Sequence, residues 1–386
     1  MKIAFFTNNY LPNPYGVSTS VDGFYRGLVA AGHEVSIFAP HWPGDDAGST
    51  PDVYRYPSVA VPTKVPFALA LPYSPEIDKF IDAQEFDIIH AHHPNILGMA
   101  ARRWASKKDI PLVFTWHSRY DHYTHYASLI PEDVAMRWVM HNAYQFAARA
   151  DHVIFPTQSV SDLYSDDLDQ HRISIVPSGV NEDLFADALP LSVRERHRIP
   201  RDAKLLITVS RLSQEKNIIF LMRSVRRFLR NHSDIYFVVC GEGELYAEAE
   251  KLFDEDGVRD RVIFVGRIAR EVVKDYLAAA DVFVYSSTTE TQGTIVTEAM
   301  YSGVPIVAVR ATGVTDLVED GVSGILTDEK WSDFVYALEK ITYDVDYRST
   351  LGQHAYAQAH ADYTVGVCTQ KLLTVYEKTL GDYKSE

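Results

Sequence analysis

The chain repeats one pattern throughout: a short apolar run rich in β-branched residues, a turn that carries Gly or Pro, and then an amphipathic segment. The first half shows it at KIAFFTN, HEVSIFAP, FDIIHAH and PLVFTWH, and the second half at KLLITVS, IYFVVC, RVIFVG and DVFVYSS. Strands that alternate with helices pair in parallel, because each helical crossover returns the chain in the same direction. The sequence therefore predicts an α/β fold built on doubly wound parallel sheets.

The length of 386 residues predicts two domains of roughly 150–200 residues each. A charged, Pro-bearing segment at 186–203 separates the two runs of alternating elements. We therefore expect a first Rossmann-like domain at 1–185, a linker at 186–203 and a second Rossmann-like domain at 204–362. The segment from Tyr363 to Tyr383 has the apolar spacing of a helix.

The composition excludes some partners. A net charge of −15 argues against a nucleic-acid-binding protein. The two cysteines are expected to be free thiols in a reducing compartment. The start MKIAFFTNNY turns polar too soon for a signal peptide, and no apolar run approaches ~18 residues. These features predict a cytoplasmic protein, with peripheral contact at the cytosolic face of a membrane left open.

The stretch from Ser286 to Gly303 carries the strongest chemical signal. Its preceding strand leads into a turn at Gly293, and a helix is expected over Thr294 to Tyr301. A helix that opens on a Gly turn directs free N–H groups and its positive dipole end at one place, which favours an anion. Glu290 and Glu298 flank this turn, and carboxylates there suit a ligand that carries hydroxyls as well as phosphates. The alternative is an ordinary first-turn acid followed by a solvated helix acid.

Two cations follow the strand KLLITV. Arg211 comes directly after this strand, and Lys216 lies five residues later, before the next helix. A guanidinium and an ammonium at the mouth of a strand-to-helix turn suit a diphosphate. The alternative is a pair of unrelated surface cations.

The first half offers two further candidates. Gly16 and Val17 lie at the junction of the first strand and its helix, where open α/β sheets bind ligands, but the dinucleotide fingerprint G-x-G-x-x-G is absent. His117 follows the strand LVFTW at the start of a loop. His90, His92 and His93 suggest a metal site, but no HExxH or Cys–His pattern accompanies them, and no metal is expected.

Together these motifs resemble the retaining, nucleotide-sugar-dependent glycosyltransferases of family 4, over nearly the whole chain. The E-x7-E signature matches Glu290 to Glu298, the R-x4-K clamp matches Arg211 to Lys216, and PSGVNEDLF matches a P-x-G-V-x4-F segment. TWHSRYDHYTHY is similar to the T-x-H-x-x-Y-x-x-Y stretch of bacterial diacylglycerol glucosyltransferases. The resemblance implies the GT-B fold, in which two Rossmann-like domains face each other across a cleft and a C-terminal helix, here 363–386, packs on the first domain.

The resemblance also implies roles for individual residues. Glu298 would hold the ribose, Glu290 the hydroxyls of the donor sugar, and Gly266 with Arg267 the base. The residues expected to bind the donor are Gly16, Val17, Arg211, Lys216, Gly266, Arg267, Glu290, Thr291, Gln292, Gly293, Thr294, Ile295 and Glu298. The residues expected to be catalytic are His117, Glu290, Arg211 and Lys216.

The acceptor is the least determined partner. Residues His117, Tyr120, Tyr123, Phe67 and Leu69 are expected to bind it, the last two within a Pro-rich apolar tract at 59–73 that we interpret as a loop. The expected reaction moves a hexose, with glucose favoured, from a nucleoside-diphosphate sugar, with UDP favoured, to a hydroxyl acceptor, with retention. Diacylglycerol and a soluble acceptor both remain open, and a sugar-nucleotide-binding protein without transfer activity is the third hypothesis. No cofactor is expected.

Overall fold

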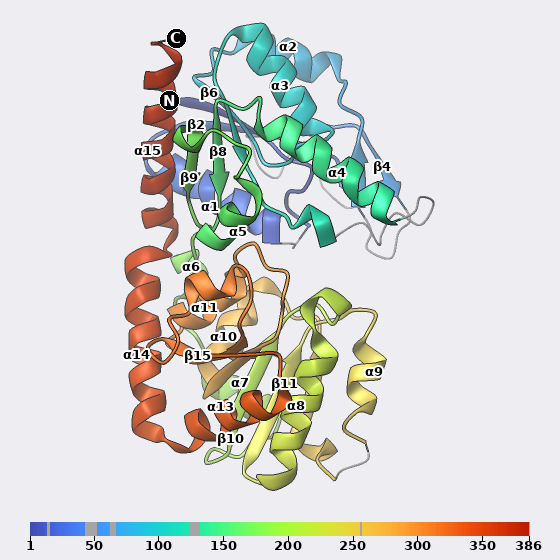
Figure 1. The fold of residues 1–386 in the computed structure, drawn as a ribbon, viewed down its shortest axis with the longest axis vertical. Helices are drawn as coiled ribbons and strands as arrows, with labels where there is room; N and C mark the ends of the chain where they lie inside the picture. The colour runs from blue at the N-terminus through green and yellow to red at the C-terminus, as the bar shows by residue number, and fades with distance from the viewer. Residues whose placement is uncertain (14–15, 43–51, 62–66, 123–131, 255–256, 386) are drawn as a thin grey trace. The chain divides into compact units, whose positions relative to one another are not determined.

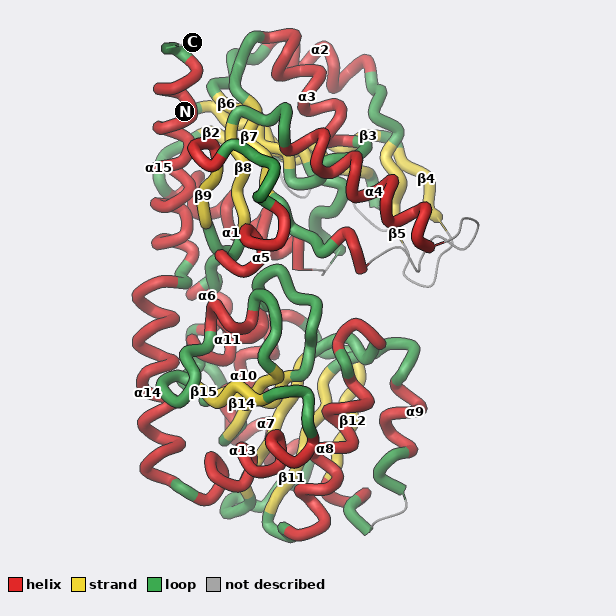
Figure 2. The backbone as a smooth tube through the Cα atoms, viewed as in Figure 1, coloured by secondary structure: helices red, strands yellow, loops and turns green. Residues whose placement is uncertain are grey.

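The computed structural model describes residues 1–13, 16–42, 52–61, 67–122, 132–254 and 257–385. The chain forms two compact units, Met1–Gly179 with Val365–Glu386, and Val180–Thr364. Each unit has its own parallel sheet with helices on both faces (Figures 1 and 2). The predicted α/β fold of doubly wound parallel sheets is confirmed.

Seven parallel strands form the sheet of the first unit within the described residues, in the order β3-β2-β1-β6-β7-β8-β9. Apolar, β-branched runs form these strands because both faces of the sheet are covered. The strands are β1 (Lys2–Phe6), β2 (Glu34–Pro40), β3 (Val53–Tyr56), β6 (Ile88–Ala91), β7 (Leu112–Thr115), β8 (His152–Phe155) and β9 (Ile173–Ile175).

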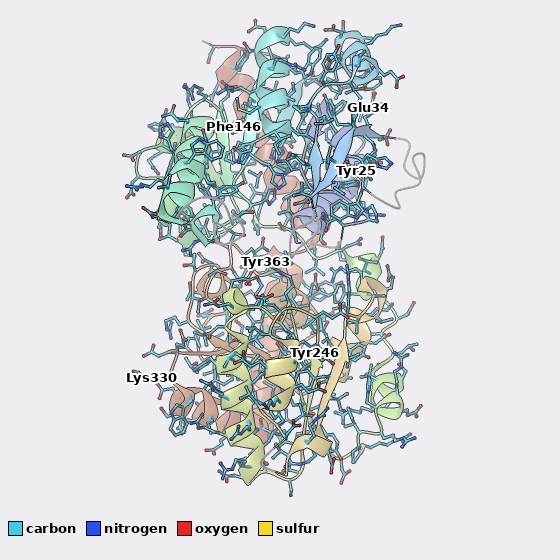
Figure 3. The ribbon with its side chains drawn as sticks, turned by 90° about the vertical axis from the view of Figure 1, so that its right-hand side faces the viewer. Tyr25, Glu34, Phe146, Tyr246, Lys330 and Tyr363 are labelled. Carbon is cyan, nitrogen blue, oxygen red and sulfur yellow. The ribbon has the colours of Figure 1, made fainter. Side chains whose placement is uncertain are left out.

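Helices cover both faces of this sheet. One core contains Phe38, Trp104 and Phe114. There, Phe146 of α4 (Glu132–Ala147), labelled in Figure 3, packs edge-on against Phe114 with ring centroids 5.0 Å apart. The other core contains Phe5, in the layer covered by α1 (Gly16–Ala30) and α15 (Val365–Tyr383). The remaining helices of this unit are α2 (Pro75–Ala83), α3 (Leu97–Lys108), α5 (Gln158–Tyr164) and the 3-10 turns η1 (Tyr120–His122) and η3 (Gln170–Arg172).

The C-terminal helix α15 packs on α1 through a small-residue contact. A Cβ added at Gly27 would lie 1.9 Å from Thr369 Oγ1, so only glycine permits this approach. Tyr376 of α15 is buried and donates to or accepts from Nδ1 of His90, 2.6 Å away. The chain thus returns to the first unit at Val365.

The tract at 59–73 differs from the predicted loop. β4 (Ser58–Val61) and β5 (Phe67–Ala70) pair antiparallel in the register Val59↔Leu69, and 62–66 lie outside the described residues. Val59 and Leu69 are 54% and 36% exposed. Among the described residues, the prolines at 57 and 72 fall outside both strands, where they remove no ladder hydrogen bond.

Six parallel strands form the sheet of the second unit within the described residues, in the order β12-β11-β10-β13-β14-β15. They are β10 (Lys204–Val209), β11 (Ile235–Cys240), β12 (Val262–Gly266), β13 (Val282–Tyr285), β14 (Ile306–Val309) and β15 (Gly324–Thr327). The helices around them are α6 (Glu182–Phe185), α7 (Pro190–Arg196), α8 (Ile218–Asn231), α9 (Tyr246–Lys251), α10 (Val273–Ala279), α11 (Thr294–Tyr301), α12 (Val314–Leu317), α13 (Trp331–Tyr343) and α14 (Val345–Asp362). The 3-10 turns are η4 (Gln214–Lys216), η5 (Arg259–Arg261) and η6 (Arg270–Val272).

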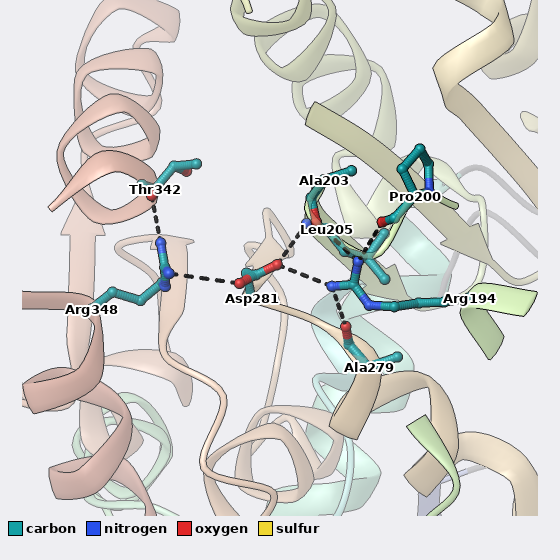
Figure 4. Close-up of polar contacts among 8 residues, drawn as sticks. All are labelled: Arg194, Pro200, Ala203, Leu205, Ala279, Asp281, Thr342 and Arg348. Atoms are coloured by element: carbon teal, nitrogen blue, oxygen red, sulfur yellow. Dashed lines mark hydrogen bonds and ion pairs between the residues drawn. The ribbon is translucent and has the colours of Figure 1, made fainter. Parts of the chain in front are cut away.

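Residues 186–203, expected as a linker, belong to the second unit. Arg194 of α7 is the reason: its guanidinium donates to the carbonyls of Ala203 and Ala279 and to Asp281 (Figure 4). Asp281 also accepts from the amide of Leu205 at 2.8 Å. A composition shift alone did not distinguish a linker from a segment fixed by one charged side chain.

Candidate functional site

Several of the predicted site residues of the second unit lie where the strand order reverses. From β10 the chain runs outward to β11 and β12 on one side, and later to β13, β14 and β15 on the other. Ligands of open α/β sheets bind at such a switch point, beyond the carboxyl ends of the strands. The turn after β10 and the turn after β13 meet there, because Ser286 Oγ donates to the carbonyl of Lys216 at 2.9 Å.

Lys216 and Glu290 form an ion pair across these two turns. The Lys216 ammonium donates to Oε1 of Glu290, and the Tyr285 hydroxyl donates to the same oxygen at 2.6 Å. Their side chains are 15% and 12% exposed. Burial opposes the charge on Glu290, but the Lys216 charge and hydrogen bonds from Lys216, Ser287 and Tyr285 outweigh it and lower the Glu290 pKa. Glu290 is therefore an ionised hydrogen-bond acceptor at neutral pH.

Glu298 has a different partner. Arg270 of η6 donates with both terminal nitrogens to the two carboxylate oxygens, with Nη1 2.7 Å from Oε2. The Glu298 side chain is only 4% exposed, and the Arg270 guanidinium lies 5.7 Å from the ring centre of Phe185. Burial opposes the charge on Arg270, but Glu298 outweighs it and raises the Arg270 pKa. A bidentate fork fixes the plane of the carboxylate as well as its charge.

Arg211 is more exposed than Lys216. Its Nη2 lies 2.7 Å from Oε1 of Glu215, and its side chain is 31% exposed. Gly241 and Gly243 bring the loop after β11 against this turn: a Cβ at Gly243 would lie 2.2 Å from the Leu212 carbonyl oxygen. The predicted cation pair is thus held in one tightly packed turn system.

The start of α11 has the geometry of an anion site. Gly293 is its N-cap, with φ of +83°, and no side chain caps the helix in the described part of the chain. Gly313 supports the turn, because a Cβ there would lie 2.8 Å from the Glu290 carbonyl oxygen. Thr291, Thr294 and Ile295 are half-buried around this turn, and Gln292 is buried. The predicted helix boundaries at Thr294 and Tyr301 are confirmed.

Gly266 is the last residue of the edge strand β12, and Arg267 follows it; this strand is not next to the switch point. Gly266 has φ of +75°, and Arg267 is exposed. The next turn, η6, places Arg270 in contact with Glu298. This segment therefore contributes to the site through Arg270, a residue that the sequence motifs do not include.

The first unit repeats the switch point between β1 and β6. Gly16 is exposed at the first position of α1, beside half-buried Val17. A Cβ at Gly16 would meet nothing within 4 Å, so no neighbour in the described residues requires glycine there. Close approach of a ligand to the backbone would require it.

His117 contacts a second histidine. Its Nε2 lies 2.9 Å from Nδ1 of His92, and both rings are buried. Burial, with smaller contributions from His93 and His90, lowers the pKa of His117 well below 6.5. His117 is therefore neutral, and it can donate or accept one hydrogen bond at each nitrogen but does not carry a positive charge.

The other histidines of this group have separate partners. His90 contacts Thr115 Oγ1 at 2.7 Å, and His93 Nδ1 accepts from the Asn8 amide at 3.1 Å. Burial lowers the pKa of His90 to about 3 and of His93 to about 4. Among the described residues, no three His, Cys, Asp or Glu side chains gather as a metal site requires.

The residues predicted to bind the acceptor are placed only in part. Tyr120 is 8% exposed and packs edge-on against Trp116, so it belongs largely to the core. Leu69 lies on the exposed hairpin and Phe67 opposite Val61 in the same register, whereas Tyr123 lies outside the described residues. Within the described residues, no helix combines the length and apolarity needed to cross a membrane.

Sequence reasoning missed Arg270, Tyr285, Glu215 and the role of His92. The sequence does contain an indication for Tyr285, because this residue ends a buried strand and its hydroxyl lies in the site. No sequence pattern indicates Arg270, because its contact with Glu298 spans 28 residues and depends on the course of the loop after β12.

Each unit has a doubly wound parallel sheet with polar residues near its switch point, and known proteins specify the class to which this fold belongs. The structure superimposes on that of Anabaena HepE in complex with UDP and glucose, with a TM-score of 0.79, 20% identity and coverage of 98% of this chain and 100% of that one. Sucrose-phosphate synthase from Thermosynechococcus elongatus gives 0.79 at 21% identity, covering 99% and 100%. The fold is that of the GT-B glycosyltransferases.

Sequence comparisons give the family. The model for glycosyl transferases group 1 matches residues 192–358, and that for glycosyltransferase family 4 matches residues 14–184. An alpha-monoglucosyldiacylglycerol synthase of Acholeplasma laidlawii is 29% identical over 367 residues, which are 92% of each chain. A GDP-mannose-dependent alpha-mannosyltransferase of Corynebacterium glutamicum is 27% identical over 85% of this chain and 77% of its own. The chain belongs to the family 4 glycosyltransferases.

Proposed function

We propose that this glycosyltransferase moves glucose from UDP-glucose to a hydroxyl of diacylglycerol, with retention at the anomeric carbon. The observation that carries the donor assignment is the pairing of Lys216 with Glu290 and of Arg270 with Glu298 around one Gly turn. A ligand with a diphosphate and two sets of sugar hydroxyls matches cations and carboxylates placed together. The name of the Acholeplasma relative supports glucose and diacylglycerol.

The diphosphate leaving group explains why the site needs positively charged residues. Cleavage of the bond between the anomeric carbon and the phosphate leaves negative charge on the diphosphate, which fixed positive groups stabilise. Arg211, Lys216 and the amides at the start of α11 are the candidates. These groups supply the charge that a divalent ion supplies elsewhere, so we propose that transfer needs no metal.

The carboxylates hold hydroxyls in this proposal. Glu298, with its plane fixed by Arg270, would accept from the ribose, and Glu290 would accept from the sugar. Retention would follow from attack on the face that the diphosphate leaves, with the phosphate oxygen taking the acceptor proton. Neither carboxylate then needs to act as a nucleophile, unlike the paired acids of retaining glycosidases.

The acceptor assignment rests on the β4–β5 hairpin as well as on the relative. Val59, Leu69 and Leu71 are 54%, 36% and 48% exposed. Apolar side chains gathered on an exposed hairpin suit shallow contact with acyl chains. Peripheral contact with a membrane from the cytoplasmic side is part of the proposal.

A soluble hydroxyl acceptor is the second candidate, favoured by the net charge of −15, which repels anionic lipid surfaces. A sugar-nucleotide-binding protein without transfer activity is the third. The ionised Glu290 and the cation pair beside it favour transfer over mere binding.

One experiment separates these candidates. The purified chain is given UDP-, GDP- and ADP-sugars with excess EDTA, first alone to measure hydrolysis, then with diacylglycerol vesicles or soluble sugars. We expect UDP-glucose and diacylglycerol to give an α-linked product that NMR identifies. An inverted product would contradict retention, and activity that EDTA abolishes and manganese restores would contradict the metal-free proposal. Binding without any product would identify the third candidate.

A further inference from the structure

Two side chains of different kinds bind the same carboxylate oxygen of Glu290. The Lys216 ammonium, from the turn after β10, and the Tyr285 hydroxyl, from the end of β13, both donate to Oε1, the hydroxyl at 2.6 Å. Ser287 adds a further hydrogen bond to this carboxylate. Lys216 is also proposed to bind the diphosphate, so it has a second task that Tyr285 does not share.

Tyr285 is the fixed donor of the two. It is the last residue of β13, it pairs with Ala308 of β14 in the sheet, and it is 3% exposed. Its ring stacks on that of Phe283, with centroids 5.7 Å apart. Burial and the neighbouring Glu290 raise the pKa of Tyr285 above its ordinary value of 10. The hydroxyl therefore keeps its proton and remains a donor.

The backbone of Lys216 is held in place, whereas its side chain is long and flexible. Ser286 Oγ donates to the Lys216 carbonyl at 2.9 Å, and Thr289 Oγ1 donates to the Glu215 carbonyl at 3.2 Å. When the ammonium turns toward a diphosphate, its contact with Glu290 weakens. Burial opposes the charge on Glu290, so a carboxylate without enough donors would take up a proton. A protonated Glu290 would carry an O–H and lose part of its capacity to accept from a sugar hydroxyl.

We propose that Tyr285 is a positioning residue that keeps Glu290 in place as a hydrogen-bond acceptor while the diphosphate of the donor draws Lys216 away. This inference rests on the proposed function for the diphosphate that binds Lys216. The contact between Tyr285 and Glu290 does not depend on that function. Tyr285 acts through Glu290 and does not touch the substrate, so its loss should change the protonation of Glu290 more than the affinity for the donor.

The protonation of Glu290 is measured directly by NMR. The chain is labelled with glutamate that carries 13C at the side-chain carboxyl, Glu290→Gln identifies the Glu290 signal, and this signal is followed through a pH titration with and without UDP. UDP carries the diphosphate but no sugar hydroxyl, so the complex shows Glu290 after Lys216 has turned away. In the UDP complex of Tyr285→Phe, we expect Glu290 to titrate about one pH unit higher than in the wild-type complex, because a hydrogen bond to a charged acceptor is lost. The change should be smaller in the free chain, since Lys216 still pairs with Glu290.

Two results would overturn the proposal. One is an unchanged Glu290 titration in the UDP complex of Tyr285→Phe, and the other is an equal change with and without UDP, which would show that Lys216 does not leave. A chain that does not bind UDP would instead defeat the proposed function. Lys216→Met then replaces UDP as the means of removing the ammonium, and Tyr285→Phe should move the Glu290 titration more in this background than in the wild-type chain. No movement there would also overturn the proposal.

The rate of transfer should follow the same titration. The titratable groups that face Glu290 are Lys216 from η4 and Tyr285 from β13. Their hydrogen bonds lower the Glu290 pKa, so removing the Tyr285 hydroxyl should raise it and move the acid limb of kcat to higher pH. The donor KM should stay within about threefold. A loss of kcat that is the same at every pH would assign Tyr285 to packing alone.

Tyr276→Phe is the matched control. Tyr276 of α10 is 1% exposed, and its hydroxyl lies 2.9 Å from Nε2 of His197. The variant removes a buried tyrosine hydroxyl from the same unit without removing a donor to Glu290. It should therefore leave the Glu290 titration and the acid limb of kcat unchanged. An equal change in Tyr276→Phe and Tyr285→Phe would show that loosened packing moves the titration, and it would contradict the proposal.

Discussion

Lys216 and Glu290, 74 residues apart in the chain, share one hydrogen-bonded ion pair where the turns after β10 and β13 meet. Tyr285 donates to the same carboxylate oxygen at 2.6 Å. The cation and the acid therefore neutralise each other before any ligand arrives. A donor that carries both phosphates and hydroxyls can engage both partners together, whereas an inorganic anion alone would have to separate Lys216 from a buried carboxylate.

Lys216→Met and Arg211→Ala should each lower both activity and stability. Each should cost transfer ~2–4 kcal/mol of transition-state stabilisation, because each removes a charge from the leaving diphosphate. Lys216→Met should also destabilise the second unit by ~3 kcal/mol, since it leaves Glu290 buried and unpaired. Arg211→Ala should destabilise it as well, because it leaves Glu215, whose side chain is 7% exposed, without its ion-pair partner. Kinetics and urea unfolding check both, with exposed Arg223→Ala as the control; near-normal turnover in both variants would remove the clamp assignment.

Glu298 and Glu290 should affect different parts of the donor. Glu298→Ala should weaken binding of UDP itself, because the ribose is present in donor and product alike. Glu290→Ala should leave UDP affinity nearly intact and damage transfer, because its proposed partner is the sugar. Calorimetry with UDP and UDP-glucose measures both. Equal losses of UDP affinity in the two variants would show that this division is wrong.

Arg270→Met should weaken recognition of the ribose as Glu298→Ala does, although Arg270 itself is not proposed to contact the ligand. Arg270 fixes the plane of Glu298 through two hydrogen bonds, so its removal should cut the preference for UDP over 2′,3′-dideoxy-UDP by roughly tenfold. Arg270→Lys keeps the charge but not the fork and should fall between. The control is Arg259→Met, which breaks a more exposed arginine–carboxylate pair with Glu250. A uniform loss of affinity for both nucleotides would place Arg270 on the diphosphate instead.

Local patterns predicted most of this architecture, and long-range contacts account for what they missed. The strands and the helix Thr294–Tyr301 were predictable because apolar periodicity and a Gly turn are encoded within a few residues. The hairpin at β4–β5 was not, because short strands separated by prolines look like a loop in sequence.

The side chains that pair with the site residues also could not be predicted from the sequence. Glu290 and Glu298 were identified by spacing, but Lys216 and Arg270 reach them from turns 74 and 28 residues away. No fixed spacing between an arginine and a later glutamate identifies the pair of Arg270 and Glu298 in the sequence. His92 was visible as a residue but not as the neighbour of His117, since that contact depends on the order of β6 and β7 in the sheet.

The first unit should lose stability in mild acid. Buried His90 has a pKa of about 3, against an ordinary value of 6.5 when unfolded. Between these values the unfolded chain binds the extra proton, so stability falls as pH drops below 6.5, by about 2 kcal/mol per such histidine at pH 5. Trp331→Phe removes the single tryptophan of 180–364, so fluorescence during urea unfolding then reports the first unit.

In that background, His90→Asn should flatten the pH dependence, whereas His171→Asn, at an exposed position, should not. The same slope in all three chains would mean that other groups control the acid transition.

The β4–β5 hairpin should determine whether the chain works at a membrane. Val59 and Leu69 are cross-strand partners, 54% and 36% exposed, so their side chains lie on one face. Because the net charge is −15, binding to vesicles should depend on apolar insertion more than on anionic lipid. Val59→Ser with Leu69→Ser should therefore reduce vesicle flotation and lipid glycosylation and spare slow donor hydrolysis. Val29→Ser with Leu163→Ser, at exposed positions on α1 and α5, should leave flotation unchanged. Unchanged flotation in the hairpin variant, with full activity on a soluble sugar, would decide for the soluble acceptor.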